Sequence, residues 1–255
     1  MRRLIELDAR LRAPDGCQWD RDQGLADLRA YLLEEAHEVA AAIDAEDWDE
    51  LAGELGDLLF QIAFLVRLAE ERGAFDLARV VDGVHAKMVA RHPHVFGGET
   101  LADAEAVRAA WERRKLREEP QRRSLLAGVP ASLPALLAAY RLTQKAAGVG
   151  FDWPEAAAVL DKVEEEVAEL KAALAAGEEQ RERVAEEVGD LLFTVANLAR
   201  KLDVDPEAAL AAANRKFRRR FEEIERRLAA QGRSAAEASR EEMDALWDEA
   251  KRERA

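Results

Sequence analysis

One segment of the sequence occurs twice, and this repeat constrains the fold more than any other feature. Residues 51–60, LAGELGDLLF, return almost unchanged as VAEEVGDLLF at residues 184–193. Four pairs of identical residues lie at offsets between 129 and 136 positions: Glu35/Glu166, Glu54/Glu187, Lys87/Lys216 and Trp111/Trp247. Offsets this constant indicate a duplicated domain. At 255 residues the chain is long enough for each half to bury its own core.

Apolar residues recur at helical spacing along the whole chain. Leu32, Ala36, Val39 and Ile43, for example, fall on one helix face. Runs of β-branched residues are scarce, so we expect an all-α fold of two tandem helical bundles. After residue 74, further helices are predicted at residues 75–91, 103–117, 136–147, 155–175, 179–201, 206–231 and 240–252.

The stretch from residue 117 to residue 134 interrupts this periodicity with charges, three prolines and a glycine. Such a composition is typical of a linker. We therefore predict an N-terminal domain at 1–118, a linker at 119–134 and a C-terminal domain at 135–255.

The charge balance and the single cysteine limit the class of partner. The chain carries 38 Lys and Arg against 52 Asp and Glu, a net charge of −14, which disfavours binding of a nucleic-acid polymer. Cys17 has no internal partner for a disulfide, so a cytoplasmic location is expected. The most apolar stretch, residues 58–66, is too short to span a bilayer, and no membrane segment is expected.

Acidic residues border the apolar stripe in both halves. Each half offers two carboxylate pairs with i, i+3 spacing: Glu35/Glu38 and Glu54/Asp57, then Glu166/Glu169 and Glu187/Asp190. Such pairs share a helix face, and two antiparallel helices can bring four carboxylates together. Four converging carboxylates repel one another unless a cation compensates, and oxygen ligands suit Mg²⁺ or Mn²⁺.

Two other interpretations of these acids are less consistent with the sequence. A solvated acidic face would carry Lys or Arg at i±3 or i±4, and the first-half quartet has none. A di-iron site could use Glu34 and His37 as a Glu-x-x-His motif, but the second half has Ala168 where the first has His37.

Basic and aromatic residues follow each acidic quartet. Lys87 and Arg91, and likewise Lys216 and Arg220, are spaced i, i+4, which suits the binding of phosphate oxygens or a solvated basic patch. A Trp-x-x-x-Lys pair stands near each domain end: Trp111/Lys115 and Trp247/Lys251. Each Trp either fills the core or offers a stacking face to a base.

The acidic motifs, together with GCQWD at 16–20, RHPHVF at 91–96 and VGFDW at 149–153, resemble the MazG family of nucleoside triphosphate pyrophosphohydrolases. The resemblance covers essentially the whole chain in the tandem two-domain form. It implies an all-α fold, homodimers with the active site at or near the dimer interface, and Mg²⁺-dependent cleavage of a nucleoside triphosphate to monophosphate and pyrophosphate. One stacking Trp defines no base edge, so we expect broad base specificity.

The resemblance also implies roles for individual residues of the second half. The metal ligands fall on Glu166, Glu169, Glu187 and Asp190, with Glu165 adjacent and able to orient the attacking water. The nucleotide contacts fall on Lys162, Arg183, Lys216, Arg220, Trp247 and Lys251. The equivalent first-half residues are Glu35, Glu38, Glu54 and Asp57 for the metal, and Lys87, Arg91, Trp111 and Lys115 for the nucleotide.

The two halves differ at two of these positions. Lys162 and Arg183 correspond to Tyr31 and Glu50, so the first half lacks one cation and reverses the sign of another. We therefore expect the second domain to be the main catalyst and the first to be a weak, regulatory or structural copy. Two alternatives remain open: a related all-α pyrophosphohydrolase for dUTP or a phosphoribosyl nucleotide, and a non-catalytic helical scaffold that binds a structural cation or a protein partner.

Overall fold

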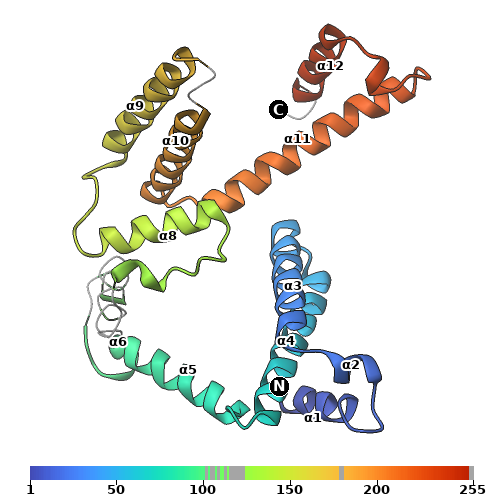
Figure 1. Ribbon diagram of the computed structural model, residues 1–255, viewed down its shortest axis with the longest axis vertical. Coiled ribbons are helices and arrows are strands. Elements are labelled where there is room, and N and C mark those ends of the chain that lie inside the picture. The colour runs from blue at the N-terminus through green and yellow to red at the C-terminus, as the bar shows by residue number, and fades with distance from the viewer. Residues whose placement is uncertain are drawn as a thin grey trace. The chain divides into compact units, whose positions relative to one another are not determined.

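The computed structural model describes residues 1–100, 124–177 and 181–252, together with Asp103, Val107, Ala110, Trp111 and Arg114. The chain divides into two compact units, Met1–Leu101 and Ala102–Ala255. Every regular element in the described ranges is helical, as Figure 1 shows, so the all-α prediction is confirmed.

The first unit is built around an antiparallel pair of long helices, α3 and α4 (Figure 1). Asp47 caps α4, because its side chain accepts hydrogen bonds from the backbone N–H groups of Asp49 and Glu50. The unit contains α1 (Arg2–Leu11), α2 (Gln18–Asp22), α3 (Leu25–Ala45), α4 (Trp48–Glu71), α5 (Leu77–Arg91) and α6 (Pro93–Phe96).

The core of the first unit lies at the end of this helix pair where α3 begins and α4 ends. Leu28 of α3 is buried against Phe64 and Leu68 of α4, and Tyr31 and Phe60 pack around them. Helix α1 packs on α4 beside this core. Burying apolar side chains here fixes how α3 and α4 face each other, and this in turn positions the acidic residues farther along both helices.

The GCQWD segment has a structural role in the first unit. A Cβ atom on Gly16 would lie 2.2 Å from the Leu11 carbonyl oxygen, so the turn between α1 and α2 requires glycine. Arg12 ties this turn to α4: its guanidinium donates to the backbone oxygen of Asp20 and forms a two-pronged ion pair with Glu71, at 3.0 and 2.9 Å. Trp19 of the same segment contacts the Tyr31 ring of α3, with ring centroids 6.1 Å apart, so the segment packs on the end of the helix pair.

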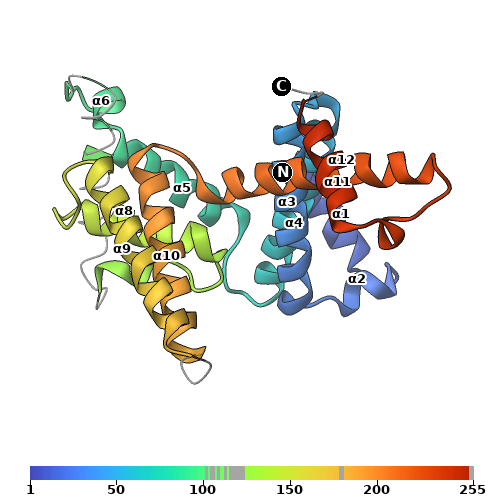
Figure 2. The ribbon, with the colours of Figure 1, turned by 90° about the horizontal axis from the view of Figure 1, so that it is seen from above.

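The second unit also contains an antiparallel pair, α9 and α10, and α10 packs on α8 as well (Figure 2). Asp205 caps α11 by accepting from the Ala208 N–H, with Pro206 in the first turn. The unit contains η1 (Leu125–Gly128), α8 (Ala135–Ala147), α9 (Ala156–Ala175), α10 (Arg181–Lys201), α11 (Pro206–Ala229), η3 (Ala235–Glu237) and α12 (Arg240–Arg252).

The VGFDW segment fixes the start of the second helix pair. The Asp152 carboxylate pairs with Arg200 at 2.5 Å and with Lys201 at 3.2 Å, and Lys201 also donates to the Trp153 carbonyl oxygen at 2.7 Å. These contacts join the loop before α9 to the end of α10. VGFDW and GCQWD therefore have a similar structural role: each lies in a segment that is tied by ion pairs or hydrogen bonds to the end of the second helix of its pair.

The predicted helices at 75–91, 136–147, 155–175, 206–231 and 240–252 are confirmed to within two residues at each end. Residues 179 and 180, and most of the helix predicted at 103–117, lie outside the described residues. The proposed domains 1–118 and 135–255 with a linker at 119–134 stay a prediction. None of the described helices has the length and apolarity that crossing a membrane requires.

Asp8 of α1 is fully buried, and neither of its carboxylate oxygens has a hydrogen-bond partner among the described residues. Its pKa is raised from 3.8 to about 6: burial is the largest cause, the nearby Asp20 carboxylate adds to it, and Arg12 and Arg67 oppose it. A raised pKa in the folded state means that stability falls as the pH rises from about 4 to about 6, because in this range the unfolded chain releases the Asp8 proton while the folded protein still holds it, which favours unfolding.

We expect Asp8→Asn to stabilise the protein at pH 7.5 by about 2 kcal/mol, which corresponds to a few degrees in Tm, because the buried charge is removed. The gain should shrink as the pH falls below 6, where Asp8 becomes neutral in the parent protein. Thermal unfolding followed by circular dichroism at pH 5 and 7.5 measures both values. Asp82→Asn on α5, which changes an exposed carboxylate, is the control. Equal shifts at the two pH values would contradict the prediction.

Candidate active site

Three carboxylates of the first unit converge between α3 and α4. One oxygen atom from each of Glu35, Glu38 and Glu54 lies within 4.8 Å of the others. Glu35 and Glu38 come from adjacent turns of α3, and Glu54 comes from α4. We call these three residues the first acidic trio.

The second unit repeats this arrangement. Oxygen atoms of Glu166 and Glu169 on α9 and of Glu187 on α10 lie within 4.8 Å of one another. Glu166 is buried and Glu187 is half-buried, whereas Glu169 is exposed. These residues form the second acidic trio, and the structure thus gathers six of the eight predicted metal ligands into two equivalent groups.

The remaining predicted ligands, Asp57 and Asp190, are exposed and lie outside these close groups. Asp57 still acts on the first trio electrostatically, because its charge contributes to raising the pKa of Glu35 and of Glu54.

Gln61 contacts the first trio and was not anticipated from the sequence. Its side chain is buried, and Nε2 donates to Glu35 Oε1 at 3.4 Å. A glutamine inside the apolar face of α4, one helical turn after Asp57, was the available signal. The corresponding residue of the second repeat is Thr194, also buried.

The first trio is strongly electronegative. Burial raises the pKa of Glu35, the Gln61 hydrogen bond opposes this shift, and the carboxylates of Asp57, Glu38 and Glu34 add to it. Burial together with the Glu38 and Glu50 carboxylates raises the pKa of Glu54. Across the described residues, no Lys or Arg forms an ion pair with Glu35, Glu38 or Glu54.

The second trio is partly neutralised by two cations of its own helices. Lys162 Nζ lies 2.8 Å from Glu166 Oε1 and 2.9 Å from Glu165 Oε1, and these two hydrogen bonds raise the pKa of Lys162. Arg183 Nε lies 3.4 Å from Glu187 Oε1. Lys162 and Arg183 are the two predicted nucleotide contacts that have no basic equivalent in the first repeat, where Tyr31 and Glu50 stand.

Both trios suit a hard divalent cation. Carboxylate oxygens on two antiparallel helices provide several negative ligands within reach of one ion, which Mg²⁺ or Mn²⁺ prefers. Glu34 and His37, the pair considered for a di-iron site, belong to neither trio. The chemistry of the donor set therefore favours an ion with oxygen ligands.

A basic and aromatic group lies where α12 packs on α11. The Trp247 ring of α12 has the Arg220 guanidinium 5.7 Å and the Lys251 ammonium 6.0 Å from its centroid. Phe217 of α11 contacts the same ring at 5.1 Å. Trp247 is thus half-buried, and two other predicted nucleotide contacts, Arg220 and Lys251, lie near its ring. Lys216 is exposed on α11.

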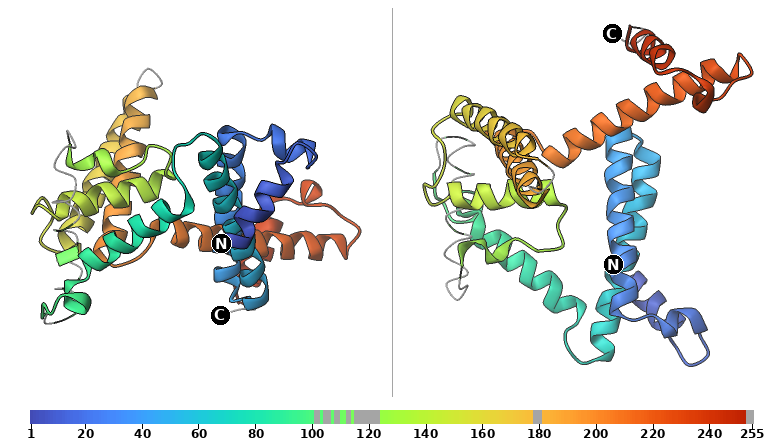
Figure 3. Two further views of the ribbon diagram at one scale, coloured as in Figure 1. Left: turned by 90° about the horizontal axis from the view of Figure 1, so that it is seen from below. Right: turned by 45° about the horizontal axis from the view of Figure 1, so that its top comes forward.

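This basic and aromatic group and the second acidic trio lie on different helix pairs of the second unit (Figures 1 and 3). In the part of the chain that the structure describes, no hydrogen bond or ion pair joins them. The predicted phosphate contacts therefore fall into two sets, Lys162 and Arg183 beside the trio, and Lys216, Arg220 and Lys251 on α11 and α12.

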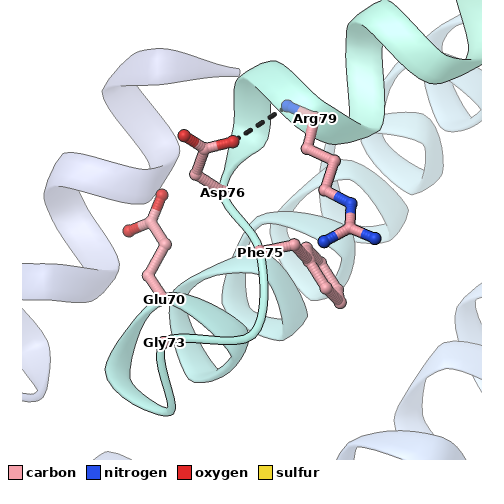
Figure 4. Close-up of a pocket in the computed structure, with 5 residues that line it drawn as sticks. All are labelled: Glu70, Gly73, Phe75, Asp76 and Arg79. Carbon is pink, nitrogen blue, oxygen red and sulfur yellow. Dashed lines mark hydrogen bonds between the residues drawn. The ribbon is translucent and has the colours of Figure 1, made fainter.

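The basic residues predicted for the first half are less well defined. Lys87 is exposed and Arg91 is half-buried, both on α5. Trp111 is half-buried, and Lys115 lies outside the described residues. A shallow hollow of about 410 Å³ at the turn between α4 and α5, lined by Glu70, Gly73, Phe75, Asp76 and Arg79, contains none of the predicted site residues (Figure 4).

Comparison with known proteins connects these trios to a reaction. A family model described as the MazG nucleotide pyrophosphohydrolase domain matches residues 23–96, and one described as phosphoribosyl-ATP pyrophosphohydrolase matches residues 144–217. The nucleoside triphosphate pyrophosphohydrolase of Escherichia coli K12 is 42% identical over 254 residues, which is 98% of this chain and 97% of that protein. The nucleoside triphosphate pyrophosphohydrolase/pyrophosphatase MazG of Thermotoga maritima is 41% identical over 249 residues, 97% of this chain and 94% of its own length. Each matched segment contains one complete acidic trio.

Proposed function

The chain belongs to the MazG family, with two such domains in tandem, and from this membership we propose that it hydrolyses nucleoside triphosphates between the α- and β-phosphates to nucleoside monophosphate and pyrophosphate. The observation that carries the proposal is the second acidic trio with two cations beside it, within a segment that matches a pyrophosphohydrolase family. Broad base specificity is part of the proposal, since one Trp face recognises any base by stacking.

The proposal assigns a role to each predicted site residue of the second unit. Glu166, Glu169 and Glu187, joined by Asp190, would hold a divalent cation, Mg²⁺ or Mn²⁺, which when bound would polarise a phosphoryl oxygen and activate water. Glu165, exposed beside the trio, orients the attacking water as a hydrogen-bond acceptor. Lys162, Arg183, Lys216 and Arg220 offset the charge of the triphosphate and of the pyrophosphate that leaves. Trp247 stacks on the base, with Lys251 at its edge.

We further propose that the enzyme is a homodimer whose active site lies at or near the subunit interface. The helix pairs that carry the trios expose large apolar side chains, among them Leu55 and Leu59 on α4 and Leu192 and Phe193 on α10. An exposed apolar face on a helix pair is suited to packing against a second copy. Such packing can also supply the trio of one chain with basic and aromatic residues of the other.

Product identification tests the proposed reaction. With Mg²⁺ and a mixed pool of nucleoside triphosphates, we expect nucleoside monophosphate and pyrophosphate in equal amounts, measured by ion-exchange chromatography and ³¹P NMR. Release of nucleoside diphosphate and phosphate would place the cleaved bond elsewhere. A complete lack of pyrophosphate would favour the non-catalytic scaffold.

A second candidate substrate is a phosphoribosyl nucleotide, because the match to the phosphoribosyl-ATP pyrophosphohydrolase model covers residues 144–217, which include the whole second trio. The same assay separates the candidates when dUTP and phosphoribosyl-ATP are added to the panel. A kcat/KM for either that far exceeds those for the common triphosphates would replace the general assignment.

A further inference from the structure

The two acidic trios are built from equivalent residues of the two repeats but have different electrostatic surroundings. In the second repeat, Lys162 and Arg183 each stand four residues before a glutamate of the trio. The equivalent residues of the first repeat are Tyr31 and Glu50. The Glu50 carboxylate adds to the negative charge at Glu54, whereas the two cations offset two of the three formal charges of the second trio. A divalent cation approaching from solvent therefore meets two different sites.

Lys162 also forms an ion pair with Glu166 Oε1, an oxygen that is a candidate metal ligand. Its ammonium lies 2.8 Å from Glu166 Oε1, and the Glu166 side chain is only 6% exposed. Removing Lys162 from this buried carboxylate without replacing its charge is costly. Metal alone must compete with a cation that is already in place and tethered one helical turn away.

A triphosphate changes this balance because it brings about four negative charges at neutral pH together with its own bound metal. Lys162 and Arg183 can then exchange a carboxylate partner for a phosphate partner, while the metal takes their place at Glu166 and Glu187. Both cations reach a new anion, so no charge is left buried and unpaired.

We propose that Lys162 and Arg183 are resident counter-ions that keep the second trio closed to free metal, so that this site accepts the ion together with the triphosphate, whereas the first trio accepts the ion alone. This inference rests on the proposed function, since it assumes that the second unit receives a triphosphate. The charge difference between the two repeats would then determine whether each trio binds the metal ion alone or together with a triphosphate.

Counting bound Mn²⁺ by electron paramagnetic resonance on the full-length chain tests this, because free and bound Mn²⁺ are distinguished without any turnover. Without nucleotide, we expect one tight Mn²⁺ class per chain, lost in Glu38→Ala and kept in Glu169→Ala. Adding an α,β-methylene triphosphate, which resists cleavage, should create a second protein-bound class, counted after equilibrium dialysis and lost in Glu169→Ala.

The decisive variant is Lys162→Met/Arg183→Met, which removes both charges and keeps an unbranched, flexible side chain at each position. It should bind Mn²⁺ at the second trio without nucleotide, with a Kd lowered about tenfold or more, since two nearby like charges are removed. Lys171→Met/Arg181→Met, with exposed residues of the same helices, is the matched control and should leave binding unchanged. Circular dichroism verifies that each variant is folded.

Two equal Mn²⁺ classes in the parent protein without nucleotide, or no gain in the Lys162→Met/Arg183→Met variant, would overturn the inference. Its failure is distinguishable from failure of the proposed function. Equal metal classes with normal pyrophosphate release reject only the counter-ion role, whereas the expected metal pattern without pyrophosphate release rejects only the catalytic assignment.

Discussion

Removal of divalent metal is expected to abolish turnover, with a fall of at least about a thousandfold, and either Mg²⁺ or Mn²⁺ should restore it. The physical reason is repulsion between the second acidic trio and the substrate. Two unit charges 4 Å apart interact by about 1 kcal/mol in bulk water and about 4 kcal/mol near a protein surface. A triphosphate facing Glu166, Glu169 and Glu187 without an intervening cation meets several such repulsions at once.

The measurement is pyrophosphate release in excess EDTA and after addition of a stoichiometric excess of each metal. Ca²⁺ is an informative control, because it also takes oxygen ligands but at longer distances and in irregular geometry, and it should restore little activity. Circular dichroism in EDTA shows whether the fold is retained. Full activity in excess EDTA would reject the metal-dependent mechanism.

The second large effect is expected from removing carboxylates of one trio at a time. Glu169→Ala/Asp190→Ala should lower kcat/KM by about a hundredfold or more, whereas Glu38→Ala/Asp57→Ala should change it only a few-fold. All four residues are exposed, so neither pair of substitutions opens a cavity. The reason for the asymmetry is the pair of cations, Lys162 and Arg183, beside the second trio alone.

The two double variants are matched controls for each other, because they remove equivalent residues from equivalent helices. The thermal unfolding of both should stay close to that of the parent protein. If Glu38→Ala/Asp57→Ala kills turnover and Glu169→Ala/Asp190→Ala leaves it intact, the main catalytic site is in the first domain. Equal losses would mean that both domains contribute.

The sequence alone is sufficient to predict the helices, because their determinants are local. The capping of α11 by Asp205 and Pro206, for example, involves only neighbouring residues. The i, i+3 spacing of Glu35 and Glu38 places both on one face whatever surrounds the helix. The repeat itself then relates the two halves, and the family resemblance follows from the motifs in the repeat.

The composition of each trio depends on the tertiary structure. Helical periodicity places Asp57 and Asp190 beside Glu54 and Glu187, but the rotation of α4 against α3, and of α10 against α9, decides which carboxylates meet. That rotation is set by side-chain packing, which includes the contact of Leu28 with Phe64 and Leu68. Gln61 reaches Glu35 for the same reason: its position in the apolar face of α4 indicates burial, but only the packing of the two helices gives its partner.

The surroundings of charged groups were also decided by tertiary contacts. Asp8 lies in an ordinary helical segment, yet it is buried because α1 packs on α4 near Arg12 and Arg67. Arg220 is far in the sequence from Trp247 and Lys251, and it meets them only because α12 folds back on α11. Local spacing determines which residues share a helix face, whereas burial and the meeting of distant charges arise from the packing of whole helices, which depends on the entire core at once.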